Sequence, residues 1–197
     1  MYVCFIDLSA AFDTINREKL MNKLSTLGIS PKIVNLIDSM YKANQMQLWD
    51  RQELSRYFMV NRGVKQGCVL SPLLFALYMN DINDKMQGGV HIGTKDEKFT
   101  IKTIMYADDI ALVAETSDML KMMINRLYEY TEENDLKVNM SKTKIMIMNK
   151  PKGRTPKSDR FYRNKIEIER VSNFKYLGVI VHQNLTHNLH VQDRARQ

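Results

Sequence analysis

The hydrophobic pattern opens with a strand and two helices. Residues 2–6 form a continuously apolar, β-rich run, which is typical of a strand buried on both faces, and Asp7 stands at its end. A helix is predicted from an N-cap at Asp13 to a stop at Gly28, and a second helix begins at Pro31. Their apolar positions recur at helical spacing: Leu20, Leu24 and Leu27 in the first, and Ile33, Leu36, Ile37 and Met40 in the second.

The middle of the chain changes from loose alternation to an apolar helix. Residues 45–60 alternate between apolar and polar side chains in the manner of two short strands. Ser71 and Pro72 mark the start of a third helix, and from Leu73 to Met79 its side chains are apolar on almost every side. We therefore expect this helix to lie in the interior and to end at the glycine pair of residues 88–89.

A hairpin with two acids at its tip is the clearest local pattern of the second half. Two β-rich runs, residues 101–106 and 110–114, are separated only by Ala107, Asp108 and Asp109. Downstream, the pattern predicts a helix that Ser117 caps and that runs to about Asn134, a strand at 144–148, an exposed linker at 150–160 and a closing hairpin of residues 161–168 and 174–181. The predicted core face of the long helix carries Leu120, Met123, Ile124, Leu127 and Tyr130.

Composition adds a globular class and a basic charge to this picture. Of 197 residues, 44% are hydrophobic and 26% are charged, which is typical of an ordinary globular domain with a substantial core. Lys and Arg outnumber Asp and Glu by 29 to 22, and residues 142–170 contain ten basic and three acidic residues. We predict a phosphate-contacting surface in this part of the chain, with a solvated charged linker as the alternative.

Cysteines and apolar runs restrict the compartment. Cys4 and Cys68 lie among apolar residues at a spacing without metal-ligand character, so we expect two reduced, buried thiols in an intracellular protein. No stretch is apolar enough to span a membrane, and we expect no membrane partner. Neither end completes a structural pattern, which predicts that the chain belongs to a longer polypeptide. No role is assigned to His182, His187 and His190, because no cysteine lies near them.

The acids Asp7, Asp108 and Asp109 suit a phosphoryl-transfer site with two metal ions. Such a site needs two divalent ions about 3.5 to 4 Å apart, bound by hard oxygen ligands. A strand that ends in an aspartate and a hairpin tipped with two more are rigid supports that can hold carboxylates against their mutual repulsion. Taken singly, each acid could equally be an ordinary strand-end or turn residue, so the prediction depends on the motifs around them.

Five segments in a definite order surround these acids. They are residues 5–13 (Phe-Ile-Asp-Leu-Ser-Ala-Ala-Phe-Asp), 62–72 (Arg-Gly-Val-Lys-Gln-Gly-Cys-Val-Leu-Ser-Pro), 106–109 (Tyr-Ala-Asp-Asp), 136–144 (Leu-Lys-Val-Asn-Met-Ser-Lys-Thr-Lys) and 174–179 (Phe-Lys-Tyr-Leu-Gly-Val). Together they resemble the reverse transcriptase family over nearly the whole chain. The last two segments are similar to the LINE-type (non-long-terminal-repeat) retrotransposon branch. The resemblance implies an α+β fold, a polymerase right-hand palm with an antiparallel sheet packed on helices, in which fingers and thumb are incomplete.

The resemblance also implies domain limits and a reaction. A palm with partial fingers would cover residues 1–149, a linker 150–160, a primer-grip-like hairpin 161–181, and the start of a thumb or a frayed tail 182–197. The implied function is that of an RNA-directed DNA polymerase (reverse transcriptase) of a retrotransposon. Its partners would be an RNA template, a DNA primer, deoxynucleoside triphosphates and the rest of the polyprotein, with fingers, thumb and endonuclease. It would act in the nucleus, at the site of integration, or in the cytoplasm.

The family's site residues correspond to positions in this chain. By resemblance, Asp7, Asp108 and Asp109 are catalytic and hold two Mg²⁺ ions, with Mn²⁺ as an alternative, and the backbone carbonyl of Leu8 adds a metal ligand. Phe12 matches the steric gate, whose ring excludes a 2′-hydroxyl; simple core packing is its other interpretation. The implied substrate-binding set is completed by Gln66, Gly67 and Lys142.

Several positions keep a second interpretation. Lys142 matches the place beside the leaving pyrophosphate, although Lys144 stands nearby. Asp13 is interpreted chiefly as a helix cap and otherwise as a catalytic part. Arg62 and Lys65 either contact nucleic acid or are plain surface charges. The strand pair that grips the primer end is matched by Tyr176, Leu177 and Gly178, which are therefore implied nucleic-acid contacts.

Two other functions stay open on the sequence alone. A catalytically idle or domesticated relic would bind RNA or a primer-template duplex without copying it, and the intact acids argue against it. A metal-dependent phosphohydrolase would use the same carboxylates, but it would not explain Phe12, the loop at residues 62–72 or the closing hairpin. Nucleotide incorporation as opposed to phosphate release separates these functions.

Overall fold

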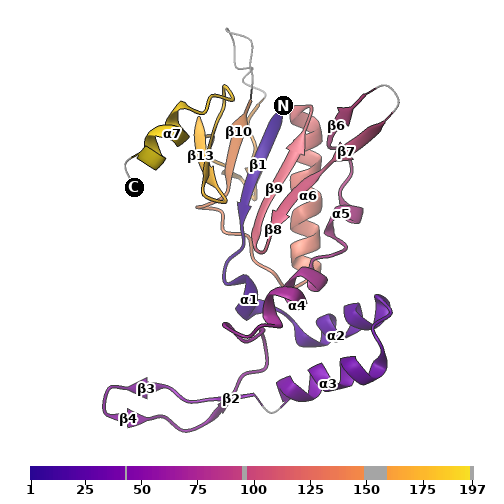
Figure 1. The fold of residues 1–197 in the computed structure, drawn as a ribbon, viewed down its shortest axis with the longest axis vertical. Coiled ribbons are helices and arrows are strands. Elements are labelled where there is room, and N and C mark those ends of the chain that lie inside the picture. Colours follow the sequence, from indigo (N-terminus) through magenta and orange to yellow (C-terminus); the bar gives the residue numbers. More distant parts are fainter. Residues whose placement is uncertain (43, 95–96, 149–158, 196–197) are drawn as a thin grey trace. The chain divides into compact units, whose positions relative to one another are not determined.

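The computed structural model describes residues 1–42, 44–94, 97–148 and 159–195, which divide into two compact units (Figure 1). The first, here called the sheet unit, consists of residues 1–9, 81–133 and 137–197. The second, the helical unit, consists of residues 10–80 and 134–136. No helix in the described ranges is long and apolar enough to cross a membrane. The predicted linker at 150–160 lies outside the described residues except for its last two positions.

A four-stranded antiparallel sheet forms the centre of the sheet unit, in the order β10-β1-β9-β8 (Figure 1). The strands are β1 (Tyr2–Asp7), β8 (Thr103–Tyr106), β9 (Asp109–Ala114) and β10 (Lys144–Ile147). The four middle residues of β1 are all buried, which explains their continuous apolar run. The predicted first strand, the acid-tipped hairpin and the strand near residue 144 are thereby confirmed.

The long helix α6 (Ser117–Glu133) covers one face of this sheet (Figure 1). Its buried face carries the predicted side chains, Leu120, Met123, Ile124, Leu127 and Tyr130. The predicted cap is wrong, because the Thr116 hydroxyl accepts a hydrogen bond from the Met119 amide at 3.2 Å and the Ser117 hydroxyl is buried without a partner. The helix therefore begins at Ser117 and takes its cap from the preceding threonine.

A second apolar layer is built on β1 and β9. The buried cluster consists of Val3, Phe5, Ala111, Val113, Met146 and Met148. Against it pack Phe174 and Tyr176 from β13 (Asn173–Tyr176) and Val181 from β14 (Val179–His182). These contacts fasten the β13–β14 hairpin to the central sheet.

The predicted closing hairpin is wrong in its pairing. Within the described residues, the segments 161–168 and 174–181 each form a hairpin of their own: β11 (Tyr162–Arg163) pairs with β12 (Ile166–Glu167), and β13 pairs with β14. Both hairpins turn through two residues with positive φ, Asn164 and Lys165 in one and Leu177 and Gly178 in the other. Such two-residue turns match the twist of adjacent strands, so local pairing is favoured over pairing between the segments.

Four further elements complete the sheet unit (Figure 1). Helix α5 (Ile82–Lys85) contacts α6, and helix α7 (Asn188–Ala195) contacts β14. Strands β6 (Val90–Gly93) and β7 (Lys98–Ile101) form an antiparallel ribbon. Val90 and Ile101 from this ribbon pack on the same buried cluster as the β13–β14 hairpin.

The helical unit combines four helices with a long, bent hairpin. The helices are α1 (Ala11–Thr14), α2 (Arg17–Thr26), α3 (Pro31–Lys42) and α4 (Ser71–Tyr78), and α2 packs against both α3 and α4. The hairpin contains β2 (Gln45–Met46), β3 (Trp49–Asp50), β4 (Glu53–Leu54) and β5 (Phe58–Met59). Because β2 pairs with β5 and β3 with β4, the predicted hairpin of two strands is present as two short ladders.

Two predicted helix ends in this unit are wrong. Asp13 lies inside α1, and the N-cap of α2 is Asn16, whose side chain accepts a hydrogen bond from the Lys19 amide at 3.1 Å. Ile15 is extended between the two helices, which separates them. Helix α4 ends at Tyr78, well before the glycine pair, and the Lys23 ammonium donates to the Tyr78 carbonyl at 2.7 Å. At both ends, a polar side chain bonds to a backbone group that the helix leaves unpaired, and the apolar pattern does not show such contacts.

The buried face of α3 also differs from the prediction. Val34, Ile37 and Tyr41 are buried, whereas Ile33, Leu36 and Met40 are 50%, 61% and 45% exposed. This helix carries two adjacent apolar stripes, and packing against α2 selects one of them. The cysteines are both free thiols, as expected, but only Cys4 is buried and Cys68 is partly exposed.

Candidate active site

Two of the three predicted acids face each other across neighbouring strands. Asp7 is the last residue of β1, Asp109 is the first residue of β9, and they are partners in the antiparallel register. Residues directly opposite in such a pair project to the same face of the sheet, with Cβ atoms about 4.5 to 5.5 Å apart. Asp108 lies beside them in the turn, where Ala107 has a φ of 51°. The fold therefore gathers the three acids at one end of the sheet.

The electrostatics of this site disfavour three bare carboxylates. Burial, followed by the nearby charges of Asp108 and Asp7, raises the pKa of Asp109, and Lys142 acts in the opposite direction. The Lys142 ammonium lies 3.4 Å from one carboxylate oxygen of Asp7. A positive charge at this place relieves the repulsion between the acids.

The donor set fits divalent cations, although the acids do not form a closed metal cage. In the described parts of the chain, no three His, Cys, Asp or Glu side chains are grouped so as to hold a metal ion by themselves. Magnesium at phosphoryl-transfer sites is usually held by one or two carboxylates together with substrate phosphates and water. Asp7 and Asp109 in register, with Asp108 at the turn, meet that requirement.

The segment after α6 runs beside the end of β1 and fixes its direction. The Ser9 amide donates to the Lys137 carbonyl at 2.7 Å, and the Asn139 amide donates to the Asp7 carbonyl at 2.8 Å. Leu8 and Val138 lie opposite each other between these two hydrogen bonds, as partners in an antiparallel β-bridge. Because the hydrogen bonds of the bridge are made by the residues on either side of them, the Leu8 carbonyl takes no part in it. This is the carbonyl that the family resemblance assigns to a metal ion.

Asn139 shapes the loop that presents Lys142. Its side-chain oxygen accepts hydrogen bonds from the Ser141 amide at 3.2 Å, the Ser141 hydroxyl at 2.7 Å and the Lys142 amide at 3.3 Å. Lys144 points its ammonium elsewhere, to Glu169 at 2.7 Å. Of the two lysines, Lys142 is therefore the one that reaches the acids.

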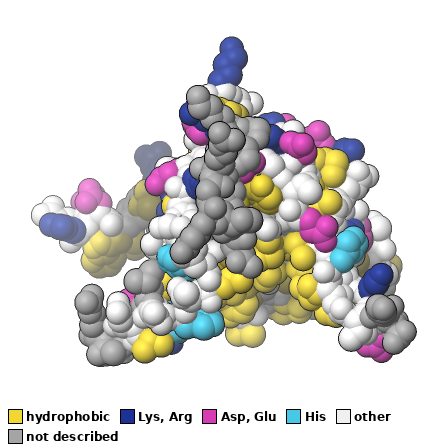
Figure 2. Space-filling view, turned by 90° about the horizontal axis from the view of Figure 1, so that it is seen from above, with side chains coloured by type: hydrophobic (Ala, Val, Ile, Leu, Met, Phe, Trp, Pro, Cys, Tyr) yellow, Lys and Arg dark blue, Asp and Glu magenta, His cyan; other side chains and the backbone are white. Residues whose placement is uncertain are grey.

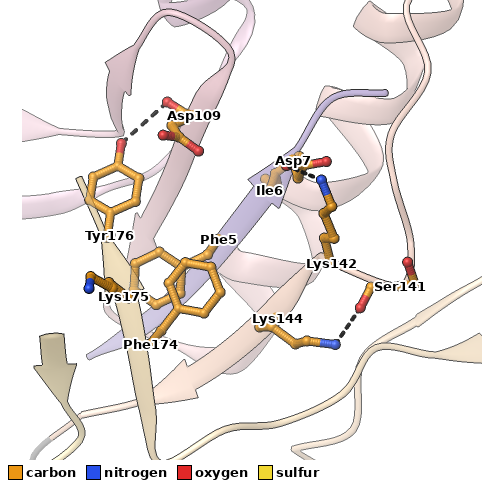
Figure 3. Close-up of a pocket in the computed structure, with 10 residues that line it drawn as sticks. All are labelled: Phe5, Ile6, Asp7, Asp109, Ser141, Lys142, Lys144, Phe174, Lys175 and Tyr176. Atoms are coloured by element: carbon orange, nitrogen blue, oxygen red, sulfur yellow. Dashed lines mark hydrogen bonds and ion pairs between the residues drawn. The ribbon is translucent and has the colours of Figure 1, made fainter. Parts of the chain in front are cut away.

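A cavity of about 390 Å³ adjoins the acids (Figure 3). Its apolar wall is the stacked pair Phe5 and Phe174, whose ring centroids are 4.3 Å apart. Its charged lining consists of Asp7, Asp109, Lys142, Lys144 and Lys175, and Ile6, Ser141 and Tyr176 complete it. The cavity thus joins the acidic end of the sheet to the β13–β14 hairpin.

Tyr176 has a role that the sequence pattern does not show. Its hydroxyl lies 3.0 Å from the Ile104 carbonyl oxygen and 3.3 Å from the Asp109 carbonyl oxygen, and it donates to them. Burial and the neighbouring Asp109 raise its pKa. The family resemblance marks Tyr176 as a primer contact, but this hydroxyl is directed into the protein.

The helical unit holds the other predicted substrate residues. The Phe12 ring is half-buried and stacks on Phe75, with centroids 4.8 Å apart. The Gln66 amide donates to both carboxylate oxygens of Asp13 at 3.1 Å, which gives Asp13 a partner in the loop instead of a cap role. Gly67 has a φ of 78°, a conformation that favours glycine, and a side chain there would meet open space.

Arg17 is a residue of this unit that sequence reasoning missed. Its guanidinium donates to the carbonyls of Gly63 at 2.8 Å, Arg62 at 2.9 Å and Tyr41 at 3.2 Å, and also to Val60. It thereby holds the loop that leads to Gln66. No spacing or composition signal marks this arginine, because its partners are backbone carbonyls distant in sequence.

The phosphate-contacting surface predicted within residues 142–170 stays a prediction, because four of its ten basic residues lie outside the described part of the chain, and Lys165 and Arg170 are exposed. Lys142, Lys144, Arg160 and Arg163 each have a carboxylate partner, at 3.4, 2.7, 3.8 and 2.8 Å. Figure 2 shows Lys and Arg side chains scattered on one face of the molecule, with hydrophobic side chains gathered between them. In the helical unit, Arg62 lies 3.8 Å from Asp135, and Lys65 is exposed.

The sheet with its acids has the arrangement expected of a polymerase palm: an aspartate ends the central strand, and two more lie at the adjacent hairpin. The model of one family, described as reverse transcriptase (RNA-dependent DNA polymerase), matches residues 1–181. The chain belongs to the reverse transcriptase family. Its relatives place it in the LINE-type, non-long-terminal-repeat branch.

Two curated relatives illustrate this membership. The chain is 29% identical over 184 residues to the Retrovirus-related Pol polyprotein from type-2 retrotransposable element R2DM of Drosophila melanogaster, covering 90% of this chain and 17% of that protein. It is 27% identical over 194 residues to the RNA-directed DNA polymerase from mobile element jockey of Drosophila funebris, covering 95% and 20%. The chain therefore spans about a fifth of the length of these relatives.

Solved structures agree on the fold. The apo telomerase from Candida Tropicalis, truncated from its C-terminal domain, matches with a TM-score of 0.64 at 14% identity, over 95% of this chain and 34% of that one. A telomerase from Candida albicans matches with a TM-score of 0.60 at 16% identity, over 93% and 29%. These likenesses confirm the predicted α+β palm.

Proposed function

We propose that the protein containing this chain is an RNA-directed DNA polymerase of a LINE-type retrotransposon. It would add deoxynucleotides to a primer 3′-hydroxyl on an RNA template by two-metal phosphoryl transfer. The observation that carries this proposal is the register of Asp7 opposite Asp109, with Asp108 in the adjoining turn. Three carboxylates gathered at the ends of rigid strands, with the pKa of Asp109 raised by burial and by the other two acids, favour the binding of divalent cations.

Asp7, Asp108 and Asp109 would hold two Mg²⁺ ions, or Mn²⁺ in their place, and the Leu8 carbonyl would add a ligand. When bound, such ions activate the attacking hydroxyl and neutralise the leaving pyrophosphate. Lys142, already 3.4 Å from Asp7, is placed to stabilise negative charge or to donate a proton as the pyrophosphate leaves. The reaction therefore depends on carboxylates for charge and on positioning by the sheet.

The helical unit would supply substrate contacts. Gln66, oriented by Asp13, and the conformation of Gly67 are suited to a loop whose backbone approaches template and nucleotide. Phe12 would exclude the 2′-hydroxyl, and Arg62 and Lys65 would contact phosphates. Leu177 and Gly178, at the tip of the β13–β14 hairpin, would contact the primer. The partners are an RNA template, a DNA primer, deoxynucleoside triphosphates and the remainder of the polyprotein in cis, including fingers, thumb and endonuclease.

The test is Asp7→Asn in the complete protein. We expect primer extension on an RNA template to fall by more than about 100-fold, because a lost charge in a preorganised site costs this much or more. Duplex binding should change little, since the metals serve the chemistry. Asp118→Asn on α6, where the side chain is 93% exposed, is the matched control and should extend normally.

Two outcomes would contradict the proposal. If Asp7→Asn extends primers within about tenfold of the parent, Asp7 is not a metal ligand. If the parent binds a primer-template duplex but incorporates no nucleotide, the chain belongs to an idle relic that acts as a binding module. Release of phosphate without incorporation would instead indicate a phosphohydrolase.

A further inference from the structure

The hydroxyl of Tyr176 bridges the two strands that carry the catalytic turn. Its first acceptor, the Ile104 carbonyl at 3.0 Å, belongs to β8. Its second acceptor, the Asp109 carbonyl at 3.3 Å, belongs to the residue that begins β9 and bears a catalytic carboxylate. One side chain from a third strand, β13, thus holds both strands of the acid-tipped hairpin close to the turn. Figure 3 shows its bond to Asp109.

The tyrosine ring is itself held in place. It packs against Phe5, with centroids 5.6 Å apart, and Phe5 also stacks on Phe174 at 4.3 Å. Phe5 is buried and lies in β1, two residues before Asp7. The contacts of Tyr176 therefore link four strands: β1, which ends in Asp7, β8, β9, which begins with Asp109, and its own strand β13.

We infer that Tyr176 is a positioning residue, which fixes the Asp109 carboxylate opposite Asp7 through its hydrogen bond to the Asp109 backbone. This inference rests on the proposed function. Both acceptors of the hydroxyl are backbone carbonyls of the sheet unit, so the hydroxyl is engaged within the protein, and the predicted primer contact of Tyr176 stays a prediction for its ring. The next two residues, Leu177 and Gly178, form the exposed turn, so the hairpin tip stays available to the primer while Tyr176 is anchored.

The same arrangement links primer and metal ligands mechanically. Displacement of the β13–β14 tip moves Tyr176, and Tyr176 is bonded to the residue that carries a metal-binding carboxylate. Catalytic geometry of this kind is sensitive to shifts of about 1 Å, which can cost about 100-fold in rate. Loss of the hydroxyl should therefore affect the chemical step and the demand for metal more than the binding of duplex.

The test is Tyr176→Phe in the complete protein, which keeps the ring and removes only the hydroxyl. We expect kcat for primer extension to fall about tenfold or more and the Mg²⁺ concentration for half-maximal rate to rise several-fold. Duplex affinity should stay within about twofold, and Mn²⁺ binding, followed by its electron spin resonance signal, should weaken. Tyr57→Phe, at a side chain that is 68% exposed, is the matched control and should change none of these quantities.

Asp7→Asn, assayed in parallel, separates the possible failures. If Asp7→Asn abolishes extension but Tyr176→Phe keeps the parental kcat and Mg²⁺ dependence, the positioning role is wrong and the proposed function stands. If Tyr176→Phe loses activity only in proportion to folded protein, with unchanged metal dependence, Tyr176 is merely structural and the inference is overturned. If Asp7→Asn extends normally, the proposed function itself fails.

Discussion

The Phe12 ring has a packing partner and an accessible side at the same time. It stacks on the buried Phe75 at 4.8 Å, yet it is only half-buried itself. Core packing and a steric gate are therefore compatible in one residue, because the stack on Phe75 would make the ring rigid. A rigid ring is what exclusion of a single hydroxyl requires.

Phe12→Val in the complete protein tests the gate. We expect ribonucleotide incorporation relative to deoxynucleotide incorporation to rise about 10- to 100-fold, since a small steric misfit is worth about 1 to 3 kcal/mol. The measurement is kcat/KM for matched ribo- and deoxyribonucleotides. Phe75→Leu keeps the gate ring but removes the stack that makes it rigid, so the ratio should rise in this variant too, by less than in Phe12→Val. An unchanged ratio in Phe12→Val, with both activities reduced, would assign Phe12 to the core alone.

Helices and strands were largely predictable where the spacing of apolar residues follows a single helical or strand repeat. The two-sided burial of β1, the acid-tipped hairpin and the core face of α6 all follow from apolar spacing. The ends of the helices were not predictable in this way. The true caps, Asn16 and Thr116, are as good cap residues as the predicted Asp13 and Ser117, and the apolar pattern does not choose between them. The predicted pairing of the last strands was wrong for a similar reason: two-residue turns with positive φ determine which strands pair, and they act locally.

The candidate site divides in the same way. That Asp7 lies beside the Asp108–Asp109 turn was predictable from strand and turn signals, whereas the place of Lys142 came from the family resemblance, and the roles of these residues stay predictions. Tyr176 and Arg17 act through backbone carbonyls that lie far away in sequence, up to 72 residues at Ile104 for Tyr176 and 46 residues at Gly63 for Arg17. Only the folded chain brings such partners together, so no sequence period records them.

Arg17 connects elements of the helical unit, and its removal should loosen a loop. It reaches from the first turn of α2 to the end of α3 at Tyr41 and to the loop at Arg62 and Gly63. We expect Arg17→Met to lower the local opening free energy of residues 60–67 by about 2 to 4 kcal/mol, because several carbonyls lose their donor. Amide hydrogen exchange in the complete protein measures this.

Two further variants give that experiment its scale. Arg17→Lys keeps the charge without the planar fork and should give an intermediate loss. Arg126→Met removes an exposed ion pair within α6 and should lower the opening free energy of that helix by less than about 0.5 kcal/mol. Unchanged exchange of residues 60–67 in Arg17→Met would show that the loop is held by other contacts.

On the scale of the whole molecule, several of the cations behind the net charge of +7 already lie beside carboxylates. Among the described residues, Lys142, Lys144, Arg160 and Arg163 lie beside carboxylates, and Lys175 lies 3.2 Å from Asp193. A cation that already has a carboxylate partner gains less from a phosphate than a free one does. Most duplex affinity should therefore come from the parts of the complete protein beyond this chain, which spans about a fifth of its relatives.

We therefore expect these 197 residues alone to be a weak binder and a poor polymerase. Binding to a primer-template duplex, followed by fluorescence anisotropy between about 50 and 200 mM salt, should weaken with salt in both proteins. Because the slope of log K against log salt is about −0.9 per phosphate contact, the complete protein should show the steeper slope by several units. Single-turnover extension by the chain alone should be at least about 100-fold slower, since triphosphate and duplex are less well positioned. Processive extension of a primed RNA template by the isolated chain, with the salt slope of the complete protein, would show that these residues suffice for clamping.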